Sequence, residues 1–459
     1  MRILFVVHEC NSPYNVFPYG LGYLAVALKN AGHLVTIFDQ ATSHYTNQEL
    51  YSFIKSEKSF DLIGLGFQAA YFPVVKNTSK AIKDSCGNTP FILGGSAPSA
   101  SPAYFIRKFN ADYVLVGEAD HSIVDFVKAL QGEIKMEDVS GLCWKEEGAI
   151  RMSPRQSPPK DLNILPFPAW DLFDIKSYTF PRRHPNVEGL VRPIGILTSR
   201  GCPFNCKFCF RLEKYRGRSI ENCIEEIRLL IKKYNVNFIE FHDDLFMVSK
   251  RRVLDFCEAI EKSGLKFNWS CNGRFNIADR EQLKAMRKVG CVEVSYGLES
   301  GDQKILNEMD KKITVEQILE VSAITKEEGI LATVPAMFGL PGETEESLKK
   351  TVETVIAATT WHDKRTIRPM QPYPGCPYWF ECLEKGFLKD EDDFYSRYIS
   401  SEKWTVNMTN VKDSDFDRIL YNANKQLLEE HYKHALGKDV MSFKKIYFDN
   451  DPKGFVPMR

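Results

Sequence analysis

The first part of the chain alternates short apolar runs with longer stretches of mixed character. The apolar runs lie at residues 2–8, 34–39, 61–67, 91–95 and 112–118. Residues 21–32 carry apolar positions at helical spacing and end in a glycine, which is typical of a helix with its stop signal. Alternating strands and helices predict a parallel sheet covered on both faces, whose ligands bind beyond the carboxyl ends of its strands.

A second alternation begins near residue 191. Its predicted strands are residues 193–199, 238–243, 267–272, 292–299, 332–340 and 366–372. Helical stretches, such as 223–234 and 345–358, lie between them. Six successive β/α units predict a (β/α)6 partial TIM barrel with an active site at the carboxyl ends of its strands.

Two segments lack this alternation. Residues 146–190 are rich in proline and predict a linker. Residues 401–459 are rich in aromatic and charged side chains, carry one helical stretch near 418–434, and are expected to form a cap. The predicted fold class is therefore α/β. It comprises an N-terminal doubly wound, Rossmann-like sheet at 1–145, the linker at 146–190, the partial barrel at 191–400 and the C-terminal cap at 401–459.

Charge and hydropathy exclude several classes of partner. The chain has 60 basic and 60 acidic side chains, so no overall basic character predicts nucleic-acid binding and no polybasic run predicts membrane-surface binding. The first residues are apolar for too short a stretch to be a signal peptide, and no apolar segment is long enough to span a membrane. The 12 cysteines are mostly scattered, as expected for reduced thiols of a cytoplasmic protein.

One group of cysteines is closely spaced. Cys202, Cys206 and Cys209 lie in the segment SRGCPFNCKFCF, directly after the first predicted barrel strand. Thiolates are the usual protein ligands of iron–sulfur clusters, and three of them leave one iron of a [4Fe-4S] cluster open to an amino and carboxylate chelator. The alternative is a zinc site with a distant fourth ligand, which this spacing fits poorly.

This loop, with the aromatic Phe208 before its last cysteine, resembles the signature of the radical S-adenosylmethionine (SAM) superfamily. The resemblance implies a [4Fe-4S] cluster on the three cysteines and SAM on the open iron, with Phe208 among the residues that contact SAM. One electron, from a donor such as flavodoxin or ferredoxin, then cleaves SAM to a 5′-deoxyadenosyl radical that abstracts hydrogen from an unactivated carbon. The protein's part is to supply a dry, oriented site.

Further SAM contacts are implied at the ends of the following predicted strands. They are Asp243, Asp244, Asn272, Arg274, Ser295, Gly297, Glu299, Gly339, Pro341 and Gly342. In the family, HDDLF holds the SAM amino group, NGR can bind its carboxylate, SYGLESG contacts ribose and carboxylate, and FGLPGET packs against adenine. Each segment also has an ordinary interpretation as a helix cap, a turn or a surface salt bridge.

The N-terminal domain resembles the cobalamin-binding domain that precedes many radical SAM barrels. The segments VFPYGLGYLAVALKNAGH, LGGSAPSA and LVGEAD carry this resemblance, because glycine lets the backbone approach a large cofactor. The implied cobalamin contacts are Pro18, Gly20, Gly94, Gly95, Ser96, Gly117 and Glu118. The sequence lacks the motif D-x-H-x-x-G, which implies cobalamin bound base-off with no protein histidine on the cobalt. A domain of this shape that binds substrate instead is the alternative.

These two cofactors predict a division of labour in which the radical removes hydrogen and methylcobalamin donates a methyl group. The leading hypothesis is therefore cobalamin-dependent methylation of an unactivated carbon. Cobalamin-assisted cyclisation, oxidation or rearrangement uses the same parts. A non-catalytic iron–sulfur redox protein and a corrinoid-carrying module are alternatives from other classes. The substrate, whether small molecule, lipid or peptide, and the catalytic acid or hydrogen donor are not readable from the sequence.

Overall fold

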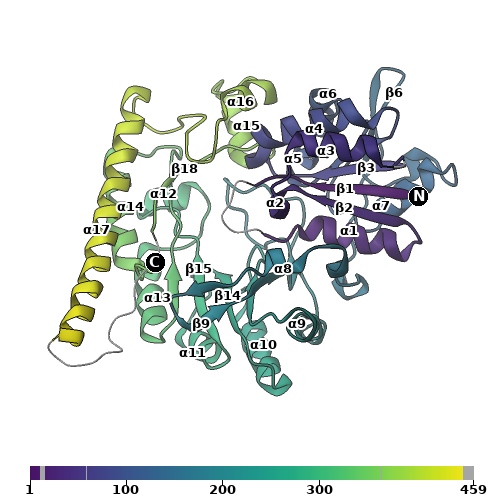
Figure 1. Ribbon diagram of the computed structural model, residues 1–459. Coiled ribbons are helices and arrows are strands. Elements are labelled where there is room, and N and C mark those ends of the chain that lie inside the picture. The colour runs from purple at the N-terminus through teal and green to yellow at the C-terminus, as the bar shows by residue number, and fades with distance from the viewer. Residues whose placement is uncertain (11–15, 58, 363, 448–459) are drawn as a thin grey trace.

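The computed structural model describes residues 1–10, 16–57, 59–362 and 364–447, and it consists of two α/β parts joined by a linker (Figure 1). The N-terminal sheet has the strand order β2-β1-β3-β4-β5-β6-β7. Its strands are β1 (Arg2–Val7), β2 (Leu34–Asp39), β3 (Leu62–Gly66), β4 (Phe91–Gly94), β5 (Tyr113–Leu115), β6 (Leu142–Glu146) and β7 (Ala149–Met152). The first five are parallel, and β6 and β7 add an antiparallel hairpin. The predicted doubly wound sheet is confirmed, but the hairpin continues past the predicted boundary at residue 145.

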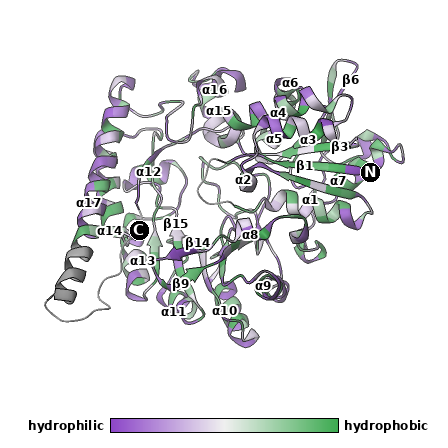
Figure 2. Ribbon diagram, viewed as in Figure 1, coloured by the Kyte–Doolittle hydropathy of each residue, from purple (hydrophilic) through white to green (hydrophobic). Residues whose placement is uncertain are grey.

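Helices cover both faces of this sheet, as a parallel sheet requires. They are α1 (Tyr19–Asn30), α2 (Gln40–Ser43), α3 (Asn47–Ser56), α4 (Phe72–Cys86), α5 (Ser96–Ala100), α6 (Pro102–Phe109) and α7 (Ser122–Leu130), with short 3-10 turns η1 (Ala69–Tyr71) and η2 (Met136–Asp138). Helices α1 and α7 lie together on one face, whereas α3, α4 and α6 lie on the other (Figure 1). The central strands are correspondingly hydrophobic (Figure 2) and buried.

The linker is ordered by short elements and aromatic contacts. It contains η3 (Leu162–Ile164), η4 (Trp170–Leu172), α8 (Ile175–Tyr178) and the hairpin β8 (Arg182–His184) and β9 (Val187–Val191). The ring of Phe17, just before α1, packs against Trp170, Phe173 and Tyr178. This aromatic cluster fixes the linker to the start of α1.

The second part is built on a five-stranded parallel sheet whose strands follow chain order. They are β10 (Pro193–Ile196), β13 (Phe238–Phe241), β14 (Asn268–Gly273), β15 (Cys291–Tyr296) and β16 (Leu331–Thr333). The helices between and after them are α9 (Ile220–Tyr234), α10 (Lys250–Ser263), α11 (Arg280–Lys288), α12 (Gln303–Glu308), α13 (Val315–Glu327) and α14 (Glu345–Ala358).

The predicted strand 332–340 is divided in two. Its second half, β17 (Met337–Phe338), pairs in parallel with β18 (Arg368–Pro369) in a separate small sheet. Pro335 lies at the break, where it has no N–H to donate to a ladder. An isolated bridge between Glu299 and Ala336 links this small sheet to the end of β15. The six strand positions therefore follow the predicted order, while a single closed six-stranded barrel sheet stays a prediction.

The C-terminal segment reaches both sides of the molecule. Helices α15 (Pro377–Glu384) and α16 (Glu391–Arg397) lie toward the N-terminal domain, whereas α17 (Asp413–Tyr447) runs along α14 on the opposite side of the barrel (Figure 1). The helix predicted near 418–434 is thus present and longer. Residues 448–459 of the predicted cap lie outside the described residues.

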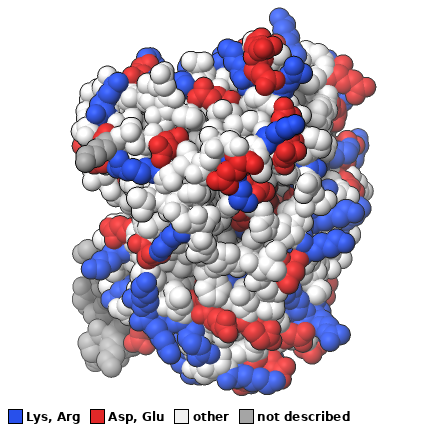
Figure 3. Space-filling view, turned by 90° about the vertical axis from the view of Figure 1, so that its right-hand side faces the viewer, with Lys and Arg blue, Asp and Glu red and all other residues white. Residues whose placement is uncertain are grey.

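Charges on the visible face are mixed. Lysine and arginine side chains alternate with aspartate and glutamate on the face that carries the N-terminal domain, and no large area of one sign dominates it (Figure 3). Among the described residues, no helix combines the length and hydrophobicity that a membrane span requires.

Candidate active site

The three cysteines lie on one loop beyond the end of β10. This loop is closed by a short antiparallel hairpin of β11 (Ser199–Arg200) and β12 (Arg216–Gly217). Gly201 starts the loop with φ at +76°, and a Cβ there would lie 2.6 Å from the Lys214 carbonyl oxygen. Only glycine fits such a turn. The sequence thus folds the three-cysteine segment into a tight loop at the carboxyl edge of the barrel sheet.

The three thiols are unpaired by disulfides and differ in exposure. Cys206 is buried, Cys202 is half-buried and Cys209 is exposed. Burial by the surrounding protein nevertheless raises the pKa of two of these thiols. The pKa of Cys202 is raised from its ordinary value, and that of Cys209 is raised to about 12. These two thiols keep their protons at neutral pH unless a cationic centre binds them, as iron does.

Zinc sites and iron–sulfur clusters place their thiolates differently. Within the described ranges, no three His, Cys, Asp or Glu side chains are grouped closely enough to hold a single metal ion. A single zinc ion needs all its thiolates about 2.3 Å from one point. A four-iron cluster binds each thiolate through a different iron and so needs them further apart.

Arg274, just beyond β14, points at the cysteine loop. Its Nη1 atom lies 3.7 Å from the Cys206 sulfur, and its guanidinium carbon lies 3.8 Å from the centre of the Phe204 ring. The side chain is 6% exposed, and its Nη2 atom is buried without a hydrogen-bond partner. Burying an unpaired donor is costly. The site therefore fits an additional acceptor, such as a carboxylate, against Arg274.

A buried ion pair lies on the other side of the loop. The Glu299 carboxylate accepts from the Lys311 ammonium at 2.7 Å, and the two residues are 8% and 6% exposed. The Lys311 nitrogen lies 5.5 Å from the centre of the Phe208 ring. A Cβ on Gly297 would lie 2.7 Å from the Lys311 nitrogen, so glycine leaves the space that the pair occupies. Lys311 carries no signal in the sequence, because two adjacent lysines after a short helix are typical of a solvated surface.

The Asp243 carboxylate makes its hydrogen bonds within the protein. Asp243 is fully buried, and its carboxylate accepts hydrogen bonds from the backbone N–H of Thr198 at 2.6 Å and of Ser199 at 3.1 Å, and from the Thr198 hydroxyl. Burial raises the pKa of Asp243. These contacts fix the backbone that leads into the cysteine loop, so they leave this carboxylate little capacity for a ligand.

The neighbouring predicted residues are differently placed. Asp244 is exposed to solvent at the surface. Neighbouring protein still partly desolvates its carboxyl group and raises the pKa, while the Gly201 N–H donates a hydrogen bond to it. Its charge is felt at the Cys202 thiol. Asn272 donates to the Asp243 carbonyl oxygen at 2.9 Å, and its register partner Ser295 is half-buried in β15. Of the two aspartates, Asp244 is therefore the one available to a ligand beside the cysteine loop.

The segment FGLPGET forms a turn after β17 that is held by hydrogen bonds between its own residues. Gly339 has φ at +118°, and its N–H donates to Glu343 at 2.7 Å, as does the Leu340 N–H at 2.9 Å. Pro341 and Gly342 lie inside this turn. Burial raises the pKa of the Glu343 carboxyl to about 8, and its Oε1 atom is buried without a partner. Glu343 was not among the predicted site residues, because its contacts form only once the turn is folded.

The predicted cobalamin contacts lie at the carboxyl edge of the N-terminal sheet. Gly95 has φ at +95°, and a Cβ there would lie 2.5 Å from the Phe67 carbonyl oxygen, so only glycine fits. At Gly20 and Gly94 a Cβ would meet nothing within 4 Å, which leaves open space at this edge. The remaining residues of the set take backbone positions there: Pro18 precedes α1, Ser96 starts α5, and the Gly117 N–H donates to the Ser99 hydroxyl at 2.9 Å.

Glu118 is engaged by the barrel. Its carboxylate binds Arg216, and binds Arg200 at 2.8 Å. Arg200 also binds Asp120 at 2.7 and 3.0 Å, and its guanidinium lies 4.6 Å from the centre of the Tyr23 ring. Because Arg200 directly precedes the cysteine loop, this network ties the loop to the N-terminal domain. Glu118 was predicted to contact cobalamin, and neither arginine was among the predicted site residues.

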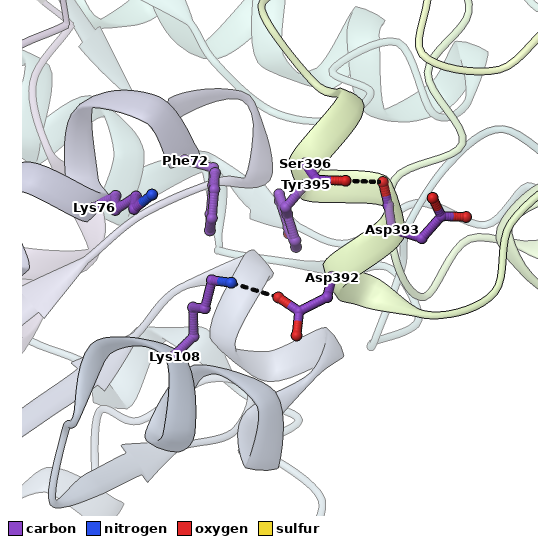
Figure 4. A pocket seen from close by; sticks show the side chains of 7 residues that line it. All are labelled: Phe72, Lys76, Lys108, Asp392, Asp393, Tyr395 and Ser396. Atoms are coloured by element: carbon purple, nitrogen blue, oxygen red, sulfur yellow. Dashed lines mark hydrogen bonds and ion pairs between the residues drawn. The ribbon is translucent and has the colours of Figure 1, made fainter.

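A surface groove of about 390 Å³ lies away from these residues. It is lined by Phe72, Lys76, Lys108, Asp392, Asp393, Tyr395 and Ser396. The side chains come from α4 and α6 on one side and α16 on the other, and Lys108 pairs with Asp392 (Figure 4). The rings of Phe72 and Tyr395 stack at 4.1 Å. This groove marks the seam where α16 holds the N-terminal domain, and it contains none of the predicted site residues.

Two sequence families match the chain. The B12 binding domain matches residues 10–127, and the Radical SAM superfamily matches residues 196–355. An uncharacterized methyltransferase of Pyrococcus horikoshii is 30% identical over 377 residues, which cover 81% of this chain and 79% of that protein. The chain belongs to the radical SAM superfamily. As a member with a B12 binding domain, it is an enzyme whose cofactors are a [4Fe-4S] cluster, SAM and cobalamin.

Two other similarities cover most of the chain. The anaerobic magnesium-protoporphyrin IX monomethyl ester cyclase of Cereibacter sphaeroides is 26% identical over 398 residues, which cover 83% of this chain and 62% of the cyclase. The solved structure of the radical SAM methyltransferase TsrM from Kitasatospora setae, with cobalamin and a [4Fe-4S] cluster bound, has 18% identity and a TM-score of 0.69 and covers 84% of this chain and 75% of TsrM. The shared fold places a B12 domain and a radical SAM domain in one arrangement.

The residues present fit the family's cofactors. The three thiols lie on one short loop, Arg274 leaves a buried donor atom for an acidic ligand, and the N-terminal edge offers open space at Gly20 and Gly94.

Proposed function

We propose that this enzyme reductively cleaves SAM and methylates an unactivated carbon of its substrate with the help of cobalamin. When bound, the cluster supplies the electron for SAM cleavage and the corrinoid supplies the methyl group. The observation that carries the proposal is the Arg200 network, because it joins the cysteine loop to the cobalamin-binding domain. The carboxyl edges of the two sheets face the same region of the molecule (Figure 1).

The chain's own residues take distinct parts in this proposal. Cys202, Cys206 and Cys209 hold the cluster. Arg274 orients the SAM carboxylate through its unpartnered Nη2 atom, and Asp244 meets the SAM ammonium. The turn after β17 packs against adenine through its backbone, which Glu343 holds in shape.

The N-terminal residues make room for the cofactor and do not bind it through charged side chains. Gly94, Gly95 and Gly117 let the backbone approach the cofactor, and Pro18, Gly20 and Ser96 complete that edge. Glu118 orients the domain through its arginine contacts. We further propose that the predicted domain boundaries hold except at residue 145, because β7 extends the N-terminal sheet to Met152. We also propose that the enzyme works in the cytoplasm and that a flavodoxin or ferredoxin supplies the electron.

The test separates the cofactors from the substrate. Purified and reconstituted anaerobically, the wild type is expected to contain iron and sulfide, to retain corrinoid through gel filtration, and to release 5′-deoxyadenosine with dithionite and SAM. Cys206→Ala is expected to release none. A wild-type protein that releases no 5′-deoxyadenosine would reject the radical chemistry, and loss of all corrinoid on gel filtration would reject the methylation.

A cobalamin-assisted cyclisation is the second candidate, and the similarity to the cyclase of C. sphaeroides favours it. A methylase must renew its methyl group from a second SAM molecule. With reduced cobalamin and SAM, we therefore expect S-adenosylhomocysteine in addition to 5′-deoxyadenosine. Release of 5′-deoxyadenosine alone would favour the cyclisation.

A further inference from the structure

Lys311 is a buried lysine beside the cysteine loop. It is 6% exposed, and its ammonium contacts Glu299 at 2.7 Å. The Lys311 nitrogen also lies 5.5 Å from the centre of the ring of Phe208, which directly precedes Cys209 in the cysteine loop. A buried charge is costly unless it is paired, so neither side chain is stable there without the other.

The backbone holds Lys311 in this place. The residues on either side, Asp310 and Lys312, are both left-handed with φ at +55°, which is uncommon outside glycine. The Lys311 N–H donates to the Leu306 carbonyl at 3.0 Å. The turn is also tied to the cysteine loop, because the Lys207 N–H donates to the Met309 carbonyl at 3.0 Å.

Glu299 is held as firmly from the opposite side. It is left-handed with φ at +63°, and its N–H donates to the Pro335 carbonyl at 3.0 Å while its own carbonyl accepts from Met337 at 2.9 Å. Two strained backbone segments thus bring one positive and one negative charge together beside Phe208 of the cysteine loop. Strain of this kind persists only where the surrounding structure enforces it.

We propose that Lys311 is a positioning residue that fixes the Glu299 carboxylate beside the cysteine loop and offsets its charge, so that the cluster can be reduced. This inference rests on the proposed function, because it concerns the cluster held by the cysteine loop. Adding an electron to a cluster on three thiolates adds negative charge. An unpaired carboxylate in this poorly solvated place opposes that step, and the Lys311 ammonium removes the opposition.

The experiment measures the midpoint potential of the reconstituted cluster in the full-length protein without SAM, by dithionite titration followed by electron paramagnetic resonance. Lys311→Met is expected to shift the potential to more negative values. Lys311→Arg keeps the charge and is expected to retain most of the wild-type potential. Lys311→Met combined with Glu299→Gln restores a neutral pair and is expected to recover most of the loss.

Lys312→Met is the matched control, because Lys312 is the next residue and its side chain is 61% exposed. It loses the same charge and is expected to leave the potential unchanged. Equal potentials for the wild type and a fully loaded Lys311→Met would overturn the inference, as would an equal shift in Lys312→Met. A wild type that assembles no cluster would reject the proposed function itself, which is a different result.

A second variant covers the case in which Lys311→Met assembles no cluster. Glu299→Gln keeps the lysine and removes the negative charge, so it is expected to shift the potential in the opposite direction, to more positive values. No positive shift in that variant would contradict the inference.

Discussion

The cysteine loop and the glycine-rich edge of the N-terminal sheet prepare for their cofactors in opposite ways. Around the loop, charged side chains are buried and held in place: Arg274, Asp243 and the Glu299–Lys311 pair. At the N-terminal edge, side chains are left out, and Gly20 and Gly94 face open space. The first arrangement suits a small charged ligand that must be oriented, and the second suits a large cofactor that needs room.

This contrast predicts that the two sites fail independently, and Cys206→Ala is the strongest test. Loss of one cluster thiolate is expected to abolish iron–sulfide content and 5′-deoxyadenosine release, whereas corrinoid retention stays at the wild-type level. Iron analysis, product chromatography and absorbance spectra after gel filtration measure the three quantities. Cys86→Ala, at a buried thiol of the N-terminal domain, is the control and is expected to change none of them. Loss of corrinoid in Cys206→Ala would show that the two sites are not separate.

The sequence predicted much of both regions because their signals are local. The cysteine spacing and the alternation of strands and helices each depend on residues close in the chain. Arg200, Lys311 and Glu343 were missed because their roles come from partners on other elements or from a turn that must fold first. Asp243 was expected to contact SAM, whereas its carboxylate binds the backbone of Thr198 and Ser199, a contact between neighbouring strand ends that no pattern marks.

The Arg200 network, which joins the cysteine loop to the N-terminal domain, is expected to give the next largest effect. Arg200→Met leaves Asp120 without its partner and Glu118 with Arg216 alone, and breaking such a buried network costs about 3 kcal/mol of unfolding free energy. Because Arg200 precedes the cysteine loop, slower 5′-deoxyadenosine release is also expected. Urea unfolding and product release measure the two effects. Arg251→Met, at a side chain that is 91% exposed on α10, is the control. An equally small change in both variants would contradict the proposed role of the Arg200 network.

Substitution at neighbouring glycines separates backbone conformation from space. Gly95→Ala is expected to cost about 2 kcal/mol of stability, because φ is +95° and the new Cβ approaches the Phe67 carbonyl oxygen. Gly94→Ala is expected to keep wild-type stability, because its Cβ enters open space, but to retain less corrinoid after gel filtration. Thermal unfolding and corrinoid absorbance measure both properties. Full corrinoid retention by Gly94→Ala would show that the cofactor does not approach this edge.

The buried carboxyl of Glu343, in the turn after β17, is expected to make the stability of the protein depend on pH. Burial raises the pKa of its carboxyl from the ordinary 4.5 to about 8, so the folded state holds this proton more tightly than the unfolded state. The resulting stability is fully present below pH 4.5 and is lost as the pH rises toward 8, by at most about 1.4 kcal/mol per pH unit. Glu343→Gln is expected to remove this slope. Urea unfolding of both proteins between pH 5 and 8 tests it, and parallel stability curves would contradict the shift.

The smallest effect is expected at the seam shown in Figure 4, where charge and aromatic packing can be compared directly. Lys108 and Asp392 are 35% and 63% exposed, so water and salt screen their attraction, and Lys108→Met is expected to cost about 0.5 kcal/mol or less. Asp392 also keeps a hydrogen bond from the Tyr104 hydroxyl at 3.1 Å. Urea unfolding at low and high salt measures the loss, with Lys76→Met in the same groove as the control. A loss of about 2 kcal/mol that persists at high salt would mean that charge holds α16 in place; otherwise the stacked rings of Phe72 and Tyr395 do.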